Sequence, residues 1–164
     1  MRYSHKFIIP AVLALIFILS CQKNQLITEQ GAMLSFSTDT VYFDTILTTL
    51  GSPTQLFKVY NPYDQPIEIQ ELFVAGGNSS FFRLNVDGVQ GNRHVNIIIP
   101  KKDSLFVFTE VTIDPLDVNN PLVIKDSIIF KTNNNFQDIK LIAYGQDVKV
   151  FNRQFLETQT WTKE

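Results

Sequence analysis

The segment that decides the fold is "TQLFKVYNPYDQPIEIQELFVA", residues 54–75. Its first part, "TQLFKVYN", is typical of a β-strand, and the following "PYDQP" contains two prolines, which cannot donate hydrogen bonds within a central sheet. In "IEIQELFVA", the positions of Ile67, Ile69 and Leu72 fit the two-residue period of a strand better than the 3.6-residue period of a helix. The segment therefore predicts two strands joined by a polar turn.

The same pattern continues on both sides of this segment. Between residues 34 and 148, short runs rich in Val, Ile, Thr and Phe alternate with turn signals such as "GGNSS", "VDGVQGN" and "PLDVNNP". Asp87-Gly88 in particular is a favoured tight hairpin sequence. About seven or eight strands at roughly ten-residue spacing leave no room for the crossover helices of an α/β fold. We therefore expect an all-β protein, an antiparallel β-sandwich over residues 34–148.

Composition limits the partners and the chemistry of this chain. Its 164 residues are 45% hydrophobic and 18% charged, which is typical of one globular domain with appendages. The net charge is -2, and leaving out Arg2 and Lys6 lowers the basic count from 14 to 12 against 16 acids, giving -4. This charge argues against nucleic-acid binding through phosphate neutralisation. With one cysteine, the chain can form neither an internal disulfide nor a cysteine-based zinc cluster.

That cysteine, Cys21, follows an export signal. Residues 1–6 are basic and residues 7–19 are apolar, a run of about 20 Å as a helix, which is too short to span a bilayer. Leu19 and Ser20 directly precede Cys21, and "ILSC" resembles the lipobox of bacterial lipoproteins. The resemblance implies that residues 1–21 are a lipoprotein signal peptide with a signal helix, and that Cys21 carries fatty acids such as palmitate. The alternative is an ordinary signal peptide that contains a cysteine.

The two ends of the exported chain differ from the strand pattern. Residues 22–33, "QKNQLITEQGAM", are mostly polar and have no clear period, so we expect a flexible tether. Residues 149–164 contain apolar side chains, including Trp161, that lie beyond the last expected strand. We expect this tail to be the start of a missing second module in a truncated chain. The alternative is a tail that folds back over the edge of the sandwich.

The middle of the chain resembles a known family. The stretch from "VYFDTILTTLGSPTQLFKVYN" to "FFRL" has the layout of ASH/hydin-type immunoglobulin-like domains, and "DSIIFKTNNNFQDIKLIAYGQD" is similar to their closing hairpin. More narrowly, it resembles the N-terminal region of Bacteroidota lipoproteins, in which such a domain often precedes a right-handed parallel β-helix. The resemblance implies an immunoglobulin-like fold for residues 34–148. Its motifs are structural, so it implies no catalytic residue.

Nucleophilic catalysis has little support in the sequence. His94 is the only histidine after Cys21, and a lipidated Cys21 could not serve as its nucleophile. The sequence "GGNSS" at 76–80 lacks the closing glycine of a G-x-S-x-G elbow. We therefore expect His94 to be a surface residue at a strand end, and the chain to be no enzyme and to need no cofactor.

The acidic loop "DPLDVNN" is the other candidate for chemistry. Asp114 and Asp117 could pair as the two carboxylates of a glycoside hydrolase, and with Asn119 and Asn120 they could offer oxygens to calcium. The loop lacks the spacing of a known calcium motif, and acidic loops commonly serve solubility. We therefore expect no metal site.

A ligand site is easier to place than a catalytic one. Tyr60 and Tyr63 flank "NP" in the turn after a strand and are the best candidates for an exposed aromatic pair that could stack on a sugar.

Together these features predict a non-catalytic lipoprotein held at a membrane by Cys21, whose immunoglobulin-like domain acts as a spacer or as an adhesion or interaction module. The alternatives are an accessory domain of a truncated polysaccharide-binding or -degrading β-helix protein, and a glycan-binding module acting alone. Partners would be the membrane and, beyond it, a polysaccharide or another envelope protein, with no nucleic acid. The residues after Cys21, "QKN", lack an aspartate or an acidic run, which favours the outer membrane facing the periplasm, with surface exposure left open.

Overall fold

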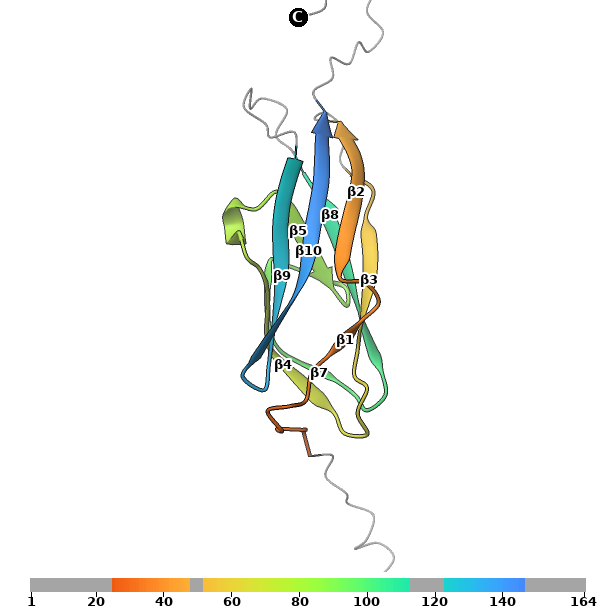
Figure 1. Ribbon diagram of the computed structural model, residues 1–164, viewed down its shortest axis with the longest axis vertical. Coiled ribbons are helices and arrows are strands. Elements are labelled where there is room, and N and C mark those ends of the chain that lie inside the picture. The colour runs from red at the N-terminus through yellow and green to blue at the C-terminus, as the bar shows by residue number, and fades with distance from the viewer. Residues whose placement is uncertain (1–24, 48–51, 113–122, 147–164) are drawn as a thin grey trace, which may run out of the picture.

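The computed structural model is a β-sandwich of two packed five-stranded sheets (Figure 1). It describes residues 25–47, 52–112 and 123–146. Three sequence predictions lie outside these residues: the signal peptide with Leu19, Ser20 and Cys21, the acidic loop with Asp114, Asp117, Asn119 and Asn120, and the tail at 149–164.

The first sheet has the strand order β1-β3-β8-β5-β6, and every neighbouring pair in it is antiparallel. Its outermost strands contain two residues each, so little edge is presented for pairing with another chain. The bounds are β1 Ser35–Phe36, β3 Gln55–Tyr60, β5 Phe82–Val86, β6 Val89–Gln90 and β8 Ser104–Val111. A short 3-10 turn, η1 Gly77–Ser79, leads into β5.

The second sheet has the order β2-β10-β9-β4-β7. The bounds are β2 Thr40–Leu47, β4 Ile67–Val74, β7 Arg93–Ile99, β9 Val123–Thr132 and β10 Asn135–Gln146. The segment that decides the fold thus supplies β3 and β4, which belong to different sheets, so its polar turn carries the chain from one layer to the other.

The structure differs from the expected sandwich in two respects. The described residues form ten strands instead of seven or eight, because β1 and β6 are too short to show a sequence period. One pair, β2 with β10, is parallel, so the sandwich is not wholly antiparallel. The chain crosses from β1 in the first sheet to β2 in the second, and β2 joins β10 without a connecting hairpin that would force an antiparallel arrangement.

Phenylalanine side chains from both sheets meet in the core. Phe130 on β9 has its ring centroid 4.9 Å from that of Phe36 and 6.4 Å from that of Phe57, both in the first sheet. Phe43 on β2 and Phe82 on β5 form a second contact between the layers, with centroids 5.6 Å apart. Since aromatic pairs at such distances add to the burial of apolar area, these contacts hold the sheets together without a disulfide.

Two hairpins show the expected turn chemistry. Asp87 and Gly88 both have positive φ and connect β5 to β6, which confirms the Asp-Gly hairpin. Asn133 and Asn134, with φ of 49° and 64°, form the two-residue turn between β9 and β10. Positive φ at both central positions is the conformation that matches the twist of paired strands, and asparagine tolerates it well.

The segment before β1 is packed where the sequence predicted a flexible tether over 22–33. Ile27 and Ala32 are buried, and the Ile27 amide donates to the carbonyl of Pro66 at 2.9 Å. The Met33 amide donates to the hydroxyl of Tyr63, and Asn135 donates to the carbonyl of Gln30. Over residues 25–33 the tether prediction is therefore wrong, because its few apolar side chains cover the end of the sandwich.

The molecule is elongated, and its described chain enters and leaves at opposite ends. Figure 1 shows the segment before β1 at the lower end of the long axis and the end of β10 at the upper end. Among the described residues, no helix has the length and apolarity needed to cross a membrane.

Candidate binding groove on the first sheet

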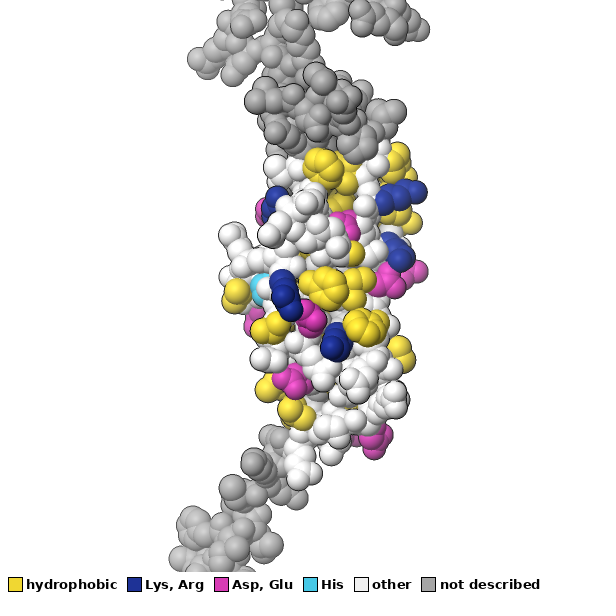
Figure 2. All heavy atoms as spheres, turned by 90° about the vertical axis from the view of Figure 1, so that its left-hand side faces the viewer, with side chains coloured by type: hydrophobic (Ala, Val, Ile, Leu, Met, Phe, Trp, Pro, Cys, Tyr) yellow, Lys and Arg dark blue, Asp and Glu magenta, His cyan; other side chains and the backbone are white. Residues whose placement is uncertain are grey.

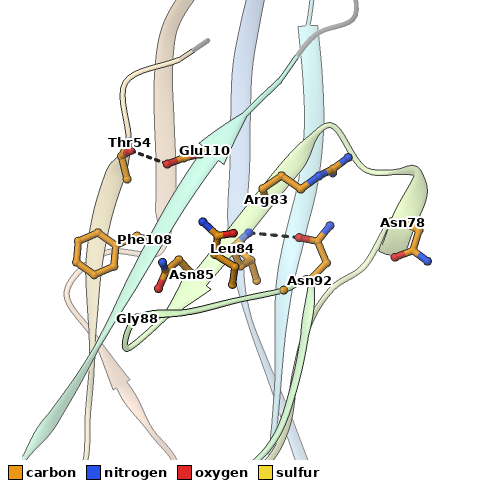
Figure 3. A pocket seen from close by; sticks show the side chains of 11 residues that line it. Thr54, Asn78, Arg83, Leu84, Asn85, Gly88, Asn92, Phe108 and Glu110 are labelled. Carbon is orange, nitrogen blue, oxygen red and sulfur yellow. Dashed lines mark hydrogen bonds between the residues drawn. The ribbon is translucent and has the colours of Figure 1, made fainter.

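An open groove lies on the outer face of the first sheet. Its volume is about 730 Å³, within the usual 300–1,000 Å³ of small-molecule sites. The floor is formed by outward-facing side chains of β5 and β8, and the β5–β6 hairpin and η1 border it (Figure 3). The residues that line it are Thr54, Asn78, Arg83, Leu84, Asn85, Gly88, Gln90, Gly91, Asn92, Phe108 and Glu110.

Strand register arranges this floor in two rows. Asn85 on β5 lies directly opposite Gln90 on one side and Phe108 on the other, which makes one row across three strands. Arg83 and Glu110 are likewise opposite each other and make the second row. Side chains in directly opposite positions have Cβ atoms about 5 Å apart, so the five groups form one continuous surface.

Arg83 is held by the backbone beside it. Its Nη1 donates to the carbonyl oxygens of Ser80 at 2.5 Å and of Phe82 at 2.8 Å. A guanidinium has five N–H donors, and the Nη2 and Nε groups make no bond within the described chain. Arg83 therefore places a fixed positive charge, with donors to spare, at the rim of the groove.

Glu110 supplies the negative charge of the same row. Its Oε1 accepts a hydrogen bond from the hydroxyl of Thr54 at 2.9 Å (Figure 3). The described residues contain three ion pairs, and none of them joins Arg83 to Glu110. The two opposite charges thus lie in one row without forming an ion pair with each other.

Asn92 closes the open edge of β5 next to the groove. Its Oδ1 accepts from the Leu84 amide at 3.3 Å (Figure 3), and its Nδ2 donates to the carbonyls of Phe82 and Gly77, each at 3.0 Å. The bonds to Leu84 and Phe82 are contacts that a further strand would make with β5. The Asn92 side chain therefore takes the place of strand pairing and fixes the edge of the groove.

Asn85 has an unmet hydrogen-bonding requirement. Its Oδ1 is buried and has no hydrogen-bond partner in the described chain. An unpaired buried acceptor costs on the order of 1–3 kcal/mol, so a rotation of the Asn85 amide that brings this oxygen to a donor would be favourable.

Apolar side chains extend the groove toward β3. Phe106 and Phe108 are both on the outer face of β8, with ring centroids 6.5 Å apart and planes 23° from parallel. Leu56 lies opposite Phe108 and is exposed, and the Lys58 ammonium lies 4.7 Å above the Phe106 ring. Polar amides thus meet the half-buried Phe108, which continues into the exposed Phe106 and Leu56.

A smaller hollow of about 400 Å³ adjoins the groove around the sandwich edge. Asn78 and Asn92 line both hollows, while Glu71, Phe73 and Arg93 line only the smaller one. The two hollows are therefore neighbours that share Asn78 and Asn92 as a common wall.

The tyrosines singled out by the sequence lie elsewhere. Tyr60 ends β3 and is exposed, whereas Tyr63 is half-buried against the core. The Tyr63 hydroxyl accepts from the Met33 amide at 2.9 Å, and its own amide donates to Asn61 Oδ1 at 3.0 Å. Neither tyrosine lines the groove.

His94 and the "GGNSS" turn have structural contacts. Nε2 of His94, which is half-buried on β7, donates to the carbonyl of Gly91 at 2.7 Å. Ser80 donates from its hydroxyl to Asp126 on β9 at 2.6 Å, and the same carboxylate accepts from the Gly76 amide at 3.1 Å. The described residues contain no group of three His, Cys, Asp or Glu side chains placed to bind a metal.

Sequence reasoning did not find the groove. Its side chains come from four separated segments around residues 54, 78, 83–92 and 108–110, and each of them has the polar residues expected of an exposed strand face. The available signal was the alternation itself: Arg83 and Asn85 in "FFRLNV", and Phe108 and Glu110 in "FVFTEV", occupy outward positions.

Comparison with known proteins gives information on the fold. No protein-family model matches the chain, and no curated protein matches its sequence. A solved protein of unknown function from Porphyromonas gingivalis W83 is 13% identical, with a TM-score of 0.51 over 68% of this chain and 46% of that one. The E. coli chaperone DraB is 15% identical, with a TM-score of 0.46 over 72% and 58% of the two chains. A family 123 glycoside hydrolase from Clostridium perfringens is 8% identical, with a TM-score of 0.47 over 67% and 23%.

Identities this low show likeness of fold alone. This chain spans about half the length of the Porphyromonas protein. The two packed sheets confirm the predicted immunoglobulin-like β-sandwich.

Proposed function

We propose that this protein is a non-catalytic, lipid-anchored module of the bacterial cell envelope that acts as a rigid spacer. The observation that carries the proposal is the position of the two ends of the described chain. The segment that follows Cys21 in sequence is at one end of the long axis, and β10 ends at the other (Figure 1). A lipid on Cys21 would place the first end at a membrane and point the second away from it.

The height of the spacer follows from its longest strand. β10 has 12 residues, which at roughly 3.3 Å per residue extend over about 40 Å. Its direction is held by long pairings with β9 and β2. Whatever is attached beyond β10 would therefore be carried about 40 Å from the anchored end.

The segment that would connect the anchor to the sandwich is held rigidly, because residues 25–33 pack on the sandwich. Ile27, Ala32 and Leu34 are buried there, and Gln137 on β10 exchanges two hydrogen bonds with the Leu34 backbone, each 2.9 Å. Residues 25–33 would then not act as a hinge between Cys21 and the sandwich. We propose that the anchor lies in the outer membrane and faces the periplasm, because the residues directly after Cys21 contain no acidic sequence.

The distribution of charged side chains on this surface favours a protein or a glycan as the partner over a nucleic acid. Figure 2 shows basic and acidic side chains interspersed on one face, without an extended basic region. The groove on the first sheet favours a second function, in which the module also binds a partner. Its ligand is considered below.

Two experiments test the proposed function. Growth with a labelled palmitate analogue should label the wild-type protein and leave Cys21→Ser unlabelled. Equal labelling of both would refute the anchor. The control is Ser4→Ala, which changes the region before the apolar run and should keep the label.

The spacer is tested by measuring height above a bilayer. Because lipid occupies the single native cysteine, Met33→Cys and Tyr144→Cys each introduce one free exposed thiol, near opposite ends of the sandwich. With the full lipoprotein in vesicles that contain a quencher lipid, a fluorophore at position 33 should be quenched strongly and one at position 144 only weakly. Equal quenching at both positions would show that the sandwich lies flat, which contradicts a spacer.

A further inference from the structure

We propose that the groove on the first sheet binds a neutral oligosaccharide, with Arg83, Asn85, Gln90, Phe108 and Glu110 as its contacts. This inference does not depend on the lipid anchor, because all five residues lie in the sandwich itself. It also differs from binding through Tyr60 and Tyr63, which lie outside the groove.

The polar groups of the groove suit a ligand with several hydroxyl groups better than a ligand with one charged group. A sugar hydroxyl donates one hydrogen bond and accepts others at the same time. Arg83 offers donors only, Glu110 offers acceptors only, and the amides of Asn85 and Gln90 offer both. The backbones of Arg83 and Glu110 are opposite each other, and the Arg83 guanidinium is turned toward the Ser80 carbonyl, away from Glu110 (Figure 3). The two charged groups would therefore contact hydroxyls on different sugars of a longer ligand.

The buried Oδ1 of Asn85 adds a specific requirement. This atom lacks a partner in the described chain, and Asn85 lies between Gln90 and Phe108 in the floor of the groove. Rotation of the Asn85 side-chain amide toward the groove would bring this oxygen to a ligand hydroxyl and remove the unfavourable desolvation. An apolar ligand would offer no such donor.

Phe108 supplies the apolar part of the site. It is half-buried and continues into the exposed Phe106 and Leu56. The face of an aromatic ring is electron-rich, so it attracts the weakly positive C–H groups that line one face of a sugar ring. A polar row next to an aromatic row therefore fits a ligand with one hydroxylated edge and one C–H face.

Charge and shape restrict the ligand to a neutral chain of sugars. Arg83 and Glu110 bring opposite charges to the floor, which gives no net attraction for phosphates or uronic acids. The groove is open, and a second hollow adjoins it at Asn78 and Asn92. Two adjoining hollows suit several linked sugars better than a single one.

Binding is tested on the purified full lipoprotein in detergent. We expect titration calorimetry to detect at least one of maltohexaose, xylohexaose, mannohexaose or chitohexaose, and hexagalacturonate to bind more weakly than the best neutral probe. Gln90→Ala and Asn85→Ala should each weaken that binding about tenfold, since each removes hydrogen bonds to the ligand. Gln65→Ala is the matched control, because it removes an exposed glutamine side chain outside the groove and should leave binding unchanged.

A second measurement locates the site independently of the variants. In 1H–15N spectra, the bound oligosaccharide should shift the side-chain amide signals of Asn85 and Gln90 and leave that of Gln65 in place. Absence of binding to every neutral probe, tighter binding of hexagalacturonate, or loss of binding in Tyr60→Ala but not in Gln90→Ala would each overturn the proposal. Palmitate labelling is unaffected by any of these results, so failure of the groove and failure of the anchor are distinguishable.

Discussion

Asn61, in the turn after β3, donates a hydrogen bond from Nδ2 to the carbonyl oxygen of Ile99 at the end of β7, 3.1 Å away. The same Nδ2 lies 2.8 Å from the carbonyl of Gln65 and 2.9 Å from that of Pro100. Asn61 is buried, and its Oδ1 accepts from the Tyr63 amide. One side chain thus joins the turn between the two sheets to the connection between β7 and β8.

Replacing Asn61 should destabilise the protein strongly. Asn61→Ala leaves the three carbonyls and the Tyr63 amide without this partner, so we expect a loss of about 3 kcal/mol in the free energy of unfolding. Urea denaturation followed by circular dichroism measures the loss. Gln65→Ala removes an exposed side chain from the same turn and should change stability by less than about 0.5 kcal/mol. Equal effects of the two variants would show that the Asn61 bonds contribute nothing.

Gly76 tests the packing of the turn before β5. A Cβ at this position would lie 2.6 Å from Asp126 Oδ2 and 3.2 Å from Ser80 Cβ, inside the group that holds the turn to β9. Gly76→Ala should therefore lower the unfolding free energy by about 1–3 kcal/mol. Gly31→Ala has open space around the new Cβ and is the control, with little expected change. A thermal melt that is the same for both variants would contradict the close approach.

Two phenylalanines of the second sheet should differ sharply in their contribution to stability. Phe130 is fully buried against Phe36 and Phe57, whereas Phe136 is 65% exposed. Phe130→Ala creates a cavity between the sheets and should cost about 3–5 kcal/mol. Phe136→Ala should stay within about 0.5 kcal/mol in the same denaturation experiment. Similar losses in both would mean that the core does not lie where the structure places it.

The packed segment before β1 predicts slow hydrogen exchange where a tether would exchange at once. The Ile27 amide is bonded to Pro66, so it should be protected in wild type. Ile27→Asp places a charge at a buried position and should abolish that protection while β9 and β10 stay protected. Gln25→Asp is the control, since Gln25 is exposed. Rapid exchange of the Ile27 amide in wild type would contradict the packed segment and support a flexible tether.

The β9–β10 turn offers a stabilising change. Asn134 has a φ of 64°, a conformation that glycine adopts without strain, and Asn-Gly is a favoured pair in this type of turn. Asn134→Gly should raise the unfolding free energy by a few tenths of a kcal/mol, and Asn134→Val should lower it by about 1 kcal/mol or more. The reverse order in a thermal melt would show that the turn is of another type.

The strands themselves were predictable because they depend on local alternation and on turn residues. "IEIQELFVA" shows this well: Ile67, Ile69, Leu72 and Val74 are buried, and the change of phase between Ile69 and Leu72 is visible in the letters. Opposite this change, Asn96 on β7 has a positive φ, and the pairing register of β7 with β4 is the same on both sides of it. The sequence contains no sign of that adjustment, since it depends on the pairing.

Sequence alone determined the all-β class, the main turns, the absence of a disulfide and the context of Cys21, because each of these depends on neighbouring residues or on residue counts. Long-range contacts set three other features: β2 runs parallel to β10, residues 25–33 pack on the sandwich, and Asn85 lies between Gln90 and Phe108. These features depend on strand register. A shift of one residue would turn Asn85 from the outer face into the core, and no local pattern records which distant strand it will meet.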